Sequence, residues 1–132
     1  MLKALVVEDE FTARCVLARF LSRHGECDVA VDGAEAVRAL EAALRQASPY
    51  QLVCLDIGLP YLGGQGVLEK LRALEQDVGV QLGHGSRVIM TTASATKEDV
   101  TGAFRGGADG YLTKPVNLTS LTQLLRNLKL VP

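Results

Sequence analysis

The sequence predicts an α/β fold in which five strand–helix units, (βα)₅, form a doubly wound parallel sheet. Short apolar runs of strand length alternate with amphipathic segments along the whole chain. Glycine and proline residues lie at many of the boundaries between these segments. Such an alternation implies right-handed crossovers with helices on both faces of the sheet. With 132 residues, the chain has the size of one domain covering residues 1–132.

The first two units lie before residue 48. Leu2–Val7 is a nearly continuous apolar run, typical of a strand covered on both faces. Phe11–His24 follows as a helix that ends before Gly25. Cys27–Val31 is the second predicted strand and Ala34–Ala47 the second helix. The apolar stripe of the first helix consists of Val16, Leu17, Phe20 and Leu21.

The third unit and the fourth strand are separated by a long connection. Leu52–Leu55 is an apolar strand, and Gly64–Glu75 is the helix that follows it. Glu75–Ser86 is rich in glycine and polar residues, so we expect a surface loop, either functional or a plain insertion. The fourth strand is predicted at Arg87–Thr91.

The remaining elements complete the pattern. A fourth helix is predicted at Lys97–Arg105, before the pair Gly106-Gly107. Gly110–Thr113 is the fifth strand and Leu118–Leu128 the fifth helix. The apolar stripe of this last helix consists of Leu118, Leu121, Leu124, Leu125 and Leu128.

Composition excludes several classes of function. The net charge of −1 gives no global field for nucleic acid or an anionic membrane, so we expect neither as a direct partner. The apolar runs are far shorter than a membrane span, and the N-terminus becomes acidic too early for a signal peptide. We therefore expect a soluble, cytoplasmic protein. Cys15, Cys27 and Cys54 are interpreted as small apolar residues in a reduced compartment, and His24 and His84 lack metal-ligand spacing.

Polar side chains follow four of the predicted strands. They are Glu8 and Asp9, Asp56, Thr92, and Lys114. In open α/β sheets, ligands collect at the carboxyl ends of the strands. If the first and third strands are neighbours, the three carboxylates converge, and a divalent cation such as Mg²⁺ or Mn²⁺ would relieve their repulsion. Any one of these residues could instead be a turn or capping residue, or a solvated lysine, but their joint placement favours a cation site beside a phosphoryl acceptor, Asp56.

The chain resembles the receiver domain of bacterial two-component response regulators, of the CheY-like, single-domain type. The resemblance covers essentially the whole sequence, and the set of motifs is specific in its order and spacing. The matching pieces are Leu5-Val6-Val7-Glu8-Asp9, Leu55-Asp56 with Pro60 and Gly64, Thr91-Thr92-Ala93, and Gly110-Tyr111-Leu112-Thr113-Lys114-Pro115. The family fold is flavodoxin-like, with strand order 2-1-3-4-5.

The resemblance implies a role for each site residue. Asp56 would take a phosphoryl group from the phosphohistidine of a histidine kinase or histidine phosphotransfer protein. Mg²⁺ would be held by Asp9, Asp56 and the backbone carbonyl of Gly58, with Glu8 acting through water. Lys114 would contact a phosphoryl oxygen, and its bond to Pro115 would be cis.

The resemblance also implies a switch. Thr92 would hydrogen-bond the phosphoryl group and move with it, while Tyr111 would turn inward, although a plain core aromatic with a wet hydroxyl is the alternative. The output surface would be the face of the fourth helix, fifth strand and fifth helix. The downstream target is unknown, and a homodimer is one option.

Some positions depart from the family pattern. Leu59 replaces a frequent Met, and Gly63 replaces a frequent Asp, which removes a helix cap. Gly58 and Ser94 are both small, so we expect water to reach the phosphoryl group and its lifetime to be short.

Two other classes of function remain open. An aspartate-nucleophile hydrolase of the haloacid dehalogenase type would carry a second Asp where this chain has Gly58. A pseudo-receiver, acting as an unphosphorylated binding module, would have lost an acidic, Thr or Lys position, and none is lost. We therefore expect a receiver that assists its own phosphorylation and dephosphorylation and is otherwise not an enzyme.

Overall fold

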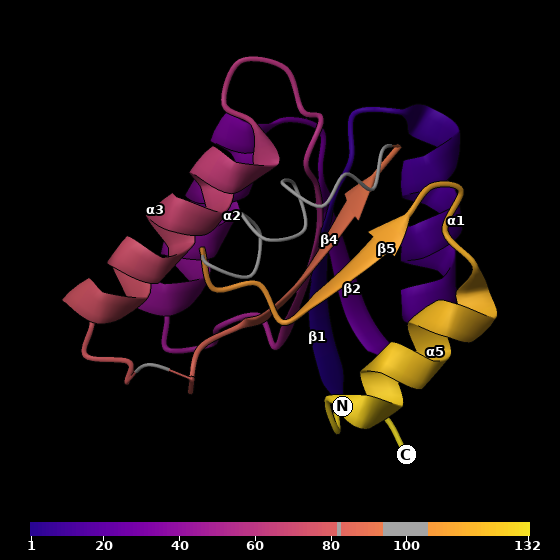
Figure 1. Cartoon of the computed structure of the whole chain (residues 1–132). Helices are drawn as coiled ribbons and strands as arrows, with labels where there is room; N and C mark the ends of the chain where they lie inside the picture. The colour runs from indigo at the N-terminus through magenta and orange to yellow at the C-terminus, as the bar shows by residue number, and fades with distance from the viewer. Residues whose placement is uncertain (82, 94–105) are drawn as a thin grey trace.

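Five parallel strands form a single twisted sheet (Figure 1). The computed structural model describes residues 1–81, 83–93 and 106–132, so the predicted helix Lys97–Arg105 lies outside the described residues. The strand order is β2-β1-β3-β4-β5, which confirms the predicted flavodoxin-like (βα)₅ topology. The strands are β1 (Leu2–Val7), β2 (Gly25–Ala30), β3 (Leu52–Asp56), β4 (Arg87–Thr92) and β5 (Gly110–Thr113).

Helices cover both faces of this sheet. In Figure 1, α2 and α3 lie on one side, while α1 and α5 lie on the other. These helices are α1 (Phe11–Leu21), α2 (Gly33–Arg45), α3 (Gly64–Asp77) and α5 (Leu118–Asn127). In the part of the chain that the structure describes, no helix combines the length and apolar character that crossing a bilayer requires.

Alternating residues of each strand fill two separate core layers. Leu5 and Leu55 point toward α2 and α3, where they pack with side chains such as Leu68. Val6 and Cys54 point the other way and pack with residues of α1 and α5 such as Leu121. Burial on both faces explains why β1 and β3 read as continuous apolar runs.

The start of β2 differs from the sequence prediction. The strand begins at Gly25, two residues before Cys27, because α1 ends at Leu21 and the chain turns at once. Gly25 pairs with Leu2 and has a φ of 155°, and a Cβ there would lie 2.1 Å from the carbonyl oxygen of Leu2. This close approach requires glycine. The pairing with β1 therefore overrides the low strand propensity of the first β2 residues.

The other element boundaries lie within about two residues of those predicted, which is the usual uncertainty for helix ends. The predicted stripes are wrong at their margins, since Val16 is 46% exposed and Leu118 is 37% exposed. The three cysteines are free, and they differ in exposure, since Cys15 is exposed and Cys27 is half-buried. Cys54 is buried, and burial raises the pKa of its thiol to about 12.

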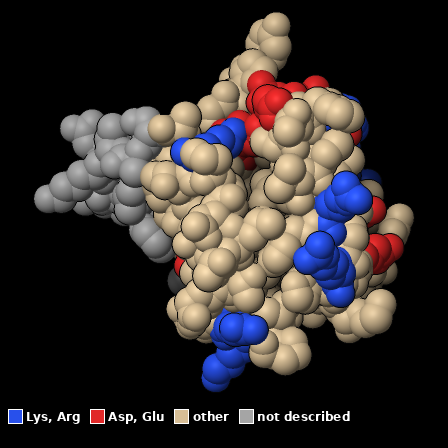
Figure 2. Space-filling view, turned by 90° about the vertical axis from the view of Figure 1, so that its right-hand side faces the viewer, with Lys and Arg blue, Asp and Glu red and all other residues tan. Residues whose placement is uncertain are grey.

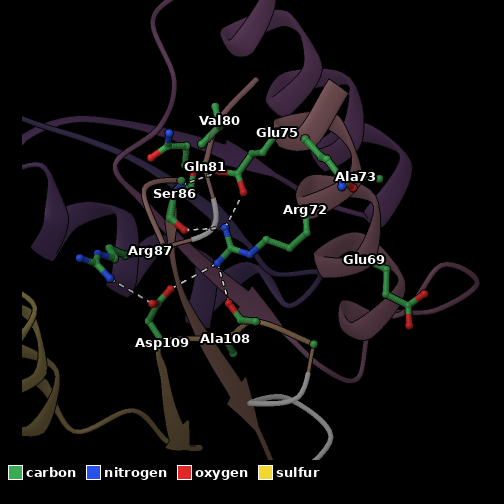
Figure 3. Close-up of a pocket in the computed structure, with 15 residues that line it drawn as sticks. Glu69, Arg72, Ala73, Glu75, Val80, Gln81, Ser86, Arg87, Ala108 and Asp109 are labelled. Atoms are coloured by element: carbon green, nitrogen blue, oxygen red, sulfur yellow. Dashed lines mark hydrogen bonds and ion pairs between the residues drawn. The ribbon is translucent and has the colours of Figure 1, made fainter. Parts of the chain in front are cut away.

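The connection from α3 to β4 is anchored by a charged cluster rather than being only a surface loop (Figure 3). Glu75 lies inside α3, which continues to Asp77, two residues past the predicted helix end, and it is 5% exposed. Its Oε1 accepts a hydrogen bond from Nη1 of Arg72 at 2.7 Å, and its Oε2 accepts one from the backbone N–H of Ser86 at 2.6 Å. Arg72 also donates to the carbonyl of Gly107 at 2.6 Å and lies 3.3 Å from Asp109. We call Arg72, Glu75 and Asp109 the Arg72 cluster.

The Arg72 cluster lies at the amino-terminal ends of β4 and β5, and it lines a cavity of about 790 Å³ together with glycine-rich turns (Figure 3). Asp109 Oδ2 also accepts the backbone N–H of Val88 at 2.8 Å. The cluster therefore ties α3 to the beginnings of two strands.

Candidate phosphoacceptor site

Three carboxylates meet at the carboxyl-terminal edge of the sheet. Glu8 and Asp9 follow β1, and Asp56 is the last residue of β3. The two strands are neighbours with Val7 opposite Leu55, so the predicted convergence occurs. One carboxylate oxygen of each residue lies within 4.8 Å of the others. Seen from the side of α1 and α5, acidic side chains gather at one end of the molecule beside a basic one (Figure 2).

Lys114 joins this group from the end of β5. Its Nζ lies 2.9 Å from Oδ2 of Asp56 and donates a hydrogen bond to it. The same nitrogen donates to Oε1 of Glu8 at 2.9 Å. Burial alone would lower the pKa of the Lys114 ammonium, but its bonds to Glu8 and Asp56 outweigh burial and raise that pKa. Lys114 is therefore a fixed positive charge at neutral pH.

Glu8 is the most deeply buried of the three carboxylates, at 1% exposed. Burial raises the pKa of its carboxyl group above the ordinary value of 4.5, and the hydrogen bond from Lys114 only partly offsets this. Its Oε2 lies 2.9 Å from Nζ of Lys114 without a hydrogen-bonding geometry, and among the described residues it has no hydrogen-bond partner. A buried carboxylate oxygen left in this way is suited to a cation.

Asp9 adds a third carboxylate to the site, beside those of Glu8 and Asp56. Its side chain is exposed to solvent, whereas the other two are buried. Three carboxylates against one lysine leave excess negative charge at the site. Hard divalent cations that prefer oxygen ligands and retain some water fit such a group. The residues present thus fit a Mg²⁺ or Mn²⁺ ion.

The turn after β3 holds Asp56 in place. Oδ1 of Asp56 accepts the backbone N–H of Gly58 at 2.9 Å. At Gly64, the first residue of α3, a Cβ would lie 2.5 Å from the carbonyl oxygen of Asp56. Glycine therefore lets α3 begin directly against the end of β3. Gly63 precedes the helix without a side-chain cap, as its sequence position predicts.

Thr92 and Tyr111 lie on the neighbouring strands. Thr92 ends β4, is 6% exposed and pairs with Thr113 of β5. The backbone N–H of Lys114 donates to its carbonyl at 2.6 Å. Tyr111 is half-buried and packs against the core layer of α2 and α3. The Lys114–Pro115 bond is cis, as expected.

One neighbour of the site, Arg14, was not singled out by the sequence. Its Nη1 donates to the backbone carbonyl of Glu8 at 3.0 Å. No sequence pattern predicts this contact, because an arginine in the first turn of a helix is usually expected to be exposed to solvent.

The site thus holds a carboxylate at the end of a strand, a lysine bonded to it and two further acids, and transfer of a phosphoryl group to an aspartate requires groups of these kinds. On a parallel sheet of this strand order, they define the class of phosphoacceptor signalling domains. The sequence model of the "Response regulator receiver domain" family matches residues 4–126. The chain therefore belongs to the response regulator receiver domain family, whose members serve as phosphoacceptors in two-component signalling.

Curated proteins with similar sequences agree with this assignment. The transcriptional regulatory protein TcrA of Mycobacterium tuberculosis is 39% identical over 127 residues, covering 96% of this chain and 45% of TcrA. The transcriptional regulatory protein CutR of Streptomyces coelicolor is 34% identical, covering 96% of this chain and 53% of CutR. This chain thus spans about half the length of the curated relatives it matches.

Solved structures match over nearly the whole chain. A CheY-like receiver domain protein from Methanospirillum hungatei has a TM-score of 0.79 at 27% identity, covering 97% of this chain and 94% of that one. The receiver domain of Ssk1 from Saccharomyces cerevisiae, solved with the histidine phosphotransfer protein Ypd1, has a TM-score of 0.77 at 28% identity. That match covers 94% of this chain and 86% of the other.

Proposed function

We propose that Asp56 accepts a phosphoryl group from the phosphohistidine of a histidine kinase or histidine phosphotransfer protein. The observation that carries this proposal is the position of the Asp56 carboxylate. It ends a buried strand, is bonded to Lys114 at 2.9 Å, and lies within 4.8 Å of the carboxylates of Glu8 and Asp9. Among the described residues, no other group of three carboxylates lies this close together.

In the transfer, a carboxylate oxygen of Asp56 forms a bond to phosphorus while the bond from phosphorus to the imidazole nitrogen breaks. The electron pair of the broken bond stays on the imidazole. Lys114 is already placed beside Oδ2 of Asp56, so it can pair with a phosphoryl oxygen without a large movement. The hydroxyl of Thr92, at the end of the adjacent strand, would donate a hydrogen bond to the same group.

Glu8, Asp9, Asp56 and the backbone carbonyl of Gly58 would hold the Mg²⁺ or Mn²⁺ ion. When bound, the ion neutralises charge on the carboxylates and on the transferred phosphoryl oxygens. Glu8 supplies a buried oxygen without a hydrogen-bond partner among the described residues, and Asp9 supplies an exposed carboxylate. The protein's own part is to keep these oxygens together against their mutual repulsion.

The response to phosphorylation would run through Thr92 and Tyr111. A phosphoryl group adds nearly two negative charges beside Lys114 and Thr92. A conformation that lets both groups reach these oxygens is favoured by their differential contacts. Tyr111 on β5 would follow Thr92, and β5 with α5 would present the change to a target protein or to a second copy of the chain. The fourth helix of the expected output face lies outside the described residues.

The phosphoryl donor is proposed to dock over this edge of the sheet. The Ssk1 receiver domain was solved together with the phosphotransfer protein Ypd1, which supports a donor of that class. Phe11 begins α1 and is 69% exposed, and Tyr61 follows β3 and is fully exposed. Exposed aromatic side chains beside a reactive group are suited to anchoring a partner.

Treating the protein with Mg²⁺ and acetyl phosphate, or with the phosphoryl mimic beryllofluoride, tests the proposal. Intact-mass or phosphorus spectra should show one phosphoryl adduct on the wild-type protein, and fluorine spectra one bound beryllofluoride, with neither on Asp56→Asn. Asp77→Asn is the matched control, because Asp77 is an exposed carboxylate at the far end of α3. An unmodified wild-type protein would favour the pseudo-receiver alternative. Release of phosphate from unrelated phosphate esters would favour the hydrolase.

A further inference from the structure

Resting on the proposed function, we infer that Arg14 is a positioning residue for the cation site. Its side chain binds the turn that follows β1, and so fixes above all where Asp9 presents its carboxylate. Arg14 itself touches neither the carboxylates nor, by this proposal, the phosphoryl group.

Arg14 binds three consecutive carbonyl groups of this turn. Its Nη1 donates to the carbonyl of Glu8 at 3.0 Å and to that of Asp9 at 3.4 Å. Its backbone N–H donates to the carbonyl of Glu10 at 3.0 Å, as the first turn of α1 requires. The side chain of Arg14 therefore restrains the peptides of Glu8 and Asp9, while its backbone bond belongs to the first turn of α1.

The constraint matters most for Asp9. Glu8 is held independently, since its side chain is buried and its backbone N–H donates to the carbonyl of Ala30 at 3.1 Å. Asp9 is exposed, so its carboxylate depends on the backbone for its direction. A rotation of the peptide between Glu8 and Asp9 would carry that carboxylate away from Asp56.

The guanidinium of Arg14 is itself held in place. Its Cζ lies 5.5 Å from the centroid of the Phe11 ring, within the range of a cation–π contact. Phe11 is 69% exposed, so its ring holds the guanidinium of Arg14 at the protein surface. The planar fork of arginine keeps its donors in a fixed direction, which a lysine would not do.

Arg14 has two opposing effects on a bound cation, and suitable variants separate them. As a positive charge it repels the cation, whereas as a hydrogen-bond donor it orients the ligands. If orientation dominates, removing the side chain weakens Mg²⁺ binding. If charge dominates, removing it tightens binding, and a lysine in its place changes little.

Titration calorimetry with Mg²⁺ on the unphosphorylated protein measures the balance. For Arg14→Met we expect about fivefold weaker binding, the size of one ordinary hydrogen bond. Arg14→Lys should show a smaller loss, and Phe11→Leu, which removes only the stacking ring, should also weaken binding. Arg19→Met is the matched control, because it removes an equal charge from the exposed last turn of α1 and should change nothing.

A second readout separates positioning from general damage. The rate of phosphorylation by acetyl phosphate should fall in Arg14→Met at low Mg²⁺ and recover at saturating Mg²⁺, while urea unfolding stays cooperative. Unchanged or tighter Mg²⁺ binding in Arg14→Met would overturn the inference. If the wild-type protein bound no Mg²⁺ at all, the proposed function would fail instead.

Discussion

At the scale of single residues, Glu8 is subject to two opposing effects, because burial disfavours its ionised form and Lys114 favours it. Its carboxylate is buried, and its raised pKa means that ionisation is less favourable in the folded chain than in the unfolded one, despite the bond from Lys114. Protonated Glu8 therefore stabilises the fold below the ordinary pKa of 4.5, and this contribution is lost as pH rises through the raised value. A divalent cation bound at Glu8 would offset this cost of ionisation.

Glu8→Gln should accordingly stabilise the metal-free protein at pH 7, by about 0.5–2 kcal/mol as for other substitutions that relieve a functional site. The amide keeps the size of the side chain and can still accept a bond from Lys114. Urea unfolding in EDTA measures the effect, and the advantage over wild type should shrink as pH is lowered through the raised pKa of Glu8. A variant less stable than wild type at pH 7 would show that the ion pair with Lys114 outweighs burial.

Gly58 lies beside the carboxylate of Asp56. It is exposed, and a Cβ there would lie 3.5 Å from Oδ1 of Asp56, so a side chain fits without a clash. Gly58→Asn should therefore slow the loss of the phosphoryl group by shielding it, while Gly79→Asn, in an exposed turn away from the site, should not. Decay of the Asp56 phosphate in Mg²⁺ measures both, and an unchanged decay in Gly58→Asn would contradict a short lifetime caused by small side chains. Ser94, the other small residue expected beside the phosphoryl group, lies outside the described residues.

At the scale of secondary-structure elements, the Arg72 cluster fixes α3 against β4 and β5. Arg72→Met should destabilise the domain by about 3 kcal/mol, because it leaves the buried Glu75 carboxylate without its cation. Arg45→Met is the control, since Arg45 makes an exposed ion pair with Glu41 at 3.2 Å that is worth only about 0.3–0.5 kcal/mol. Urea unfolding compares the two variants. Equal losses would show that the cluster is no stronger than a surface pair.

Comparison of the predicted and observed elements shows which features the sequence predicts. The periodicity of apolar residues predicts every described strand and helix, and strand ends alone bring Glu8, Asp9, Asp56 and Lys114 together. The start of β2 was missed because it depends on pairing with Leu2, and the burial of Glu75 was missed because it depends on the contact with Ser86 across the loop. Arg72 meets Asp109 across 37 positions, and no local pattern encodes such a contact. Arg14 was missed for a related reason, since its acceptors are backbone carbonyls that every residue carries.

At the scale of the whole molecule, binding at one edge of the sheet should stabilise all of it. A cation that binds only the folded chain adds about 2.7 kcal/mol at a concentration one hundred times its dissociation constant. The free energy of unfolding should therefore rise with Mg²⁺, and Asp9→Asn should lose most of this increase. Asp9 is exposed, so its substitution should leave the metal-free stability close to that of wild type. Urea unfolding across a Mg²⁺ series provides the measurement, and an equal rise in Asp9→Asn would exclude Asp9 as a ligand.

The bond between Lys114 and Glu8 has a consequence for how the chain folds. It joins residues 106 positions apart, so most of the chain must be ordered before it can close. A nascent or partly folded chain can complete β3 and expose Asp56 while it still lacks the lysine that arrives with β5. The ability of Asp56 to be phosphorylated should therefore appear late in folding. A kinase that requires Lys114 would not phosphorylate chains that have not finished folding.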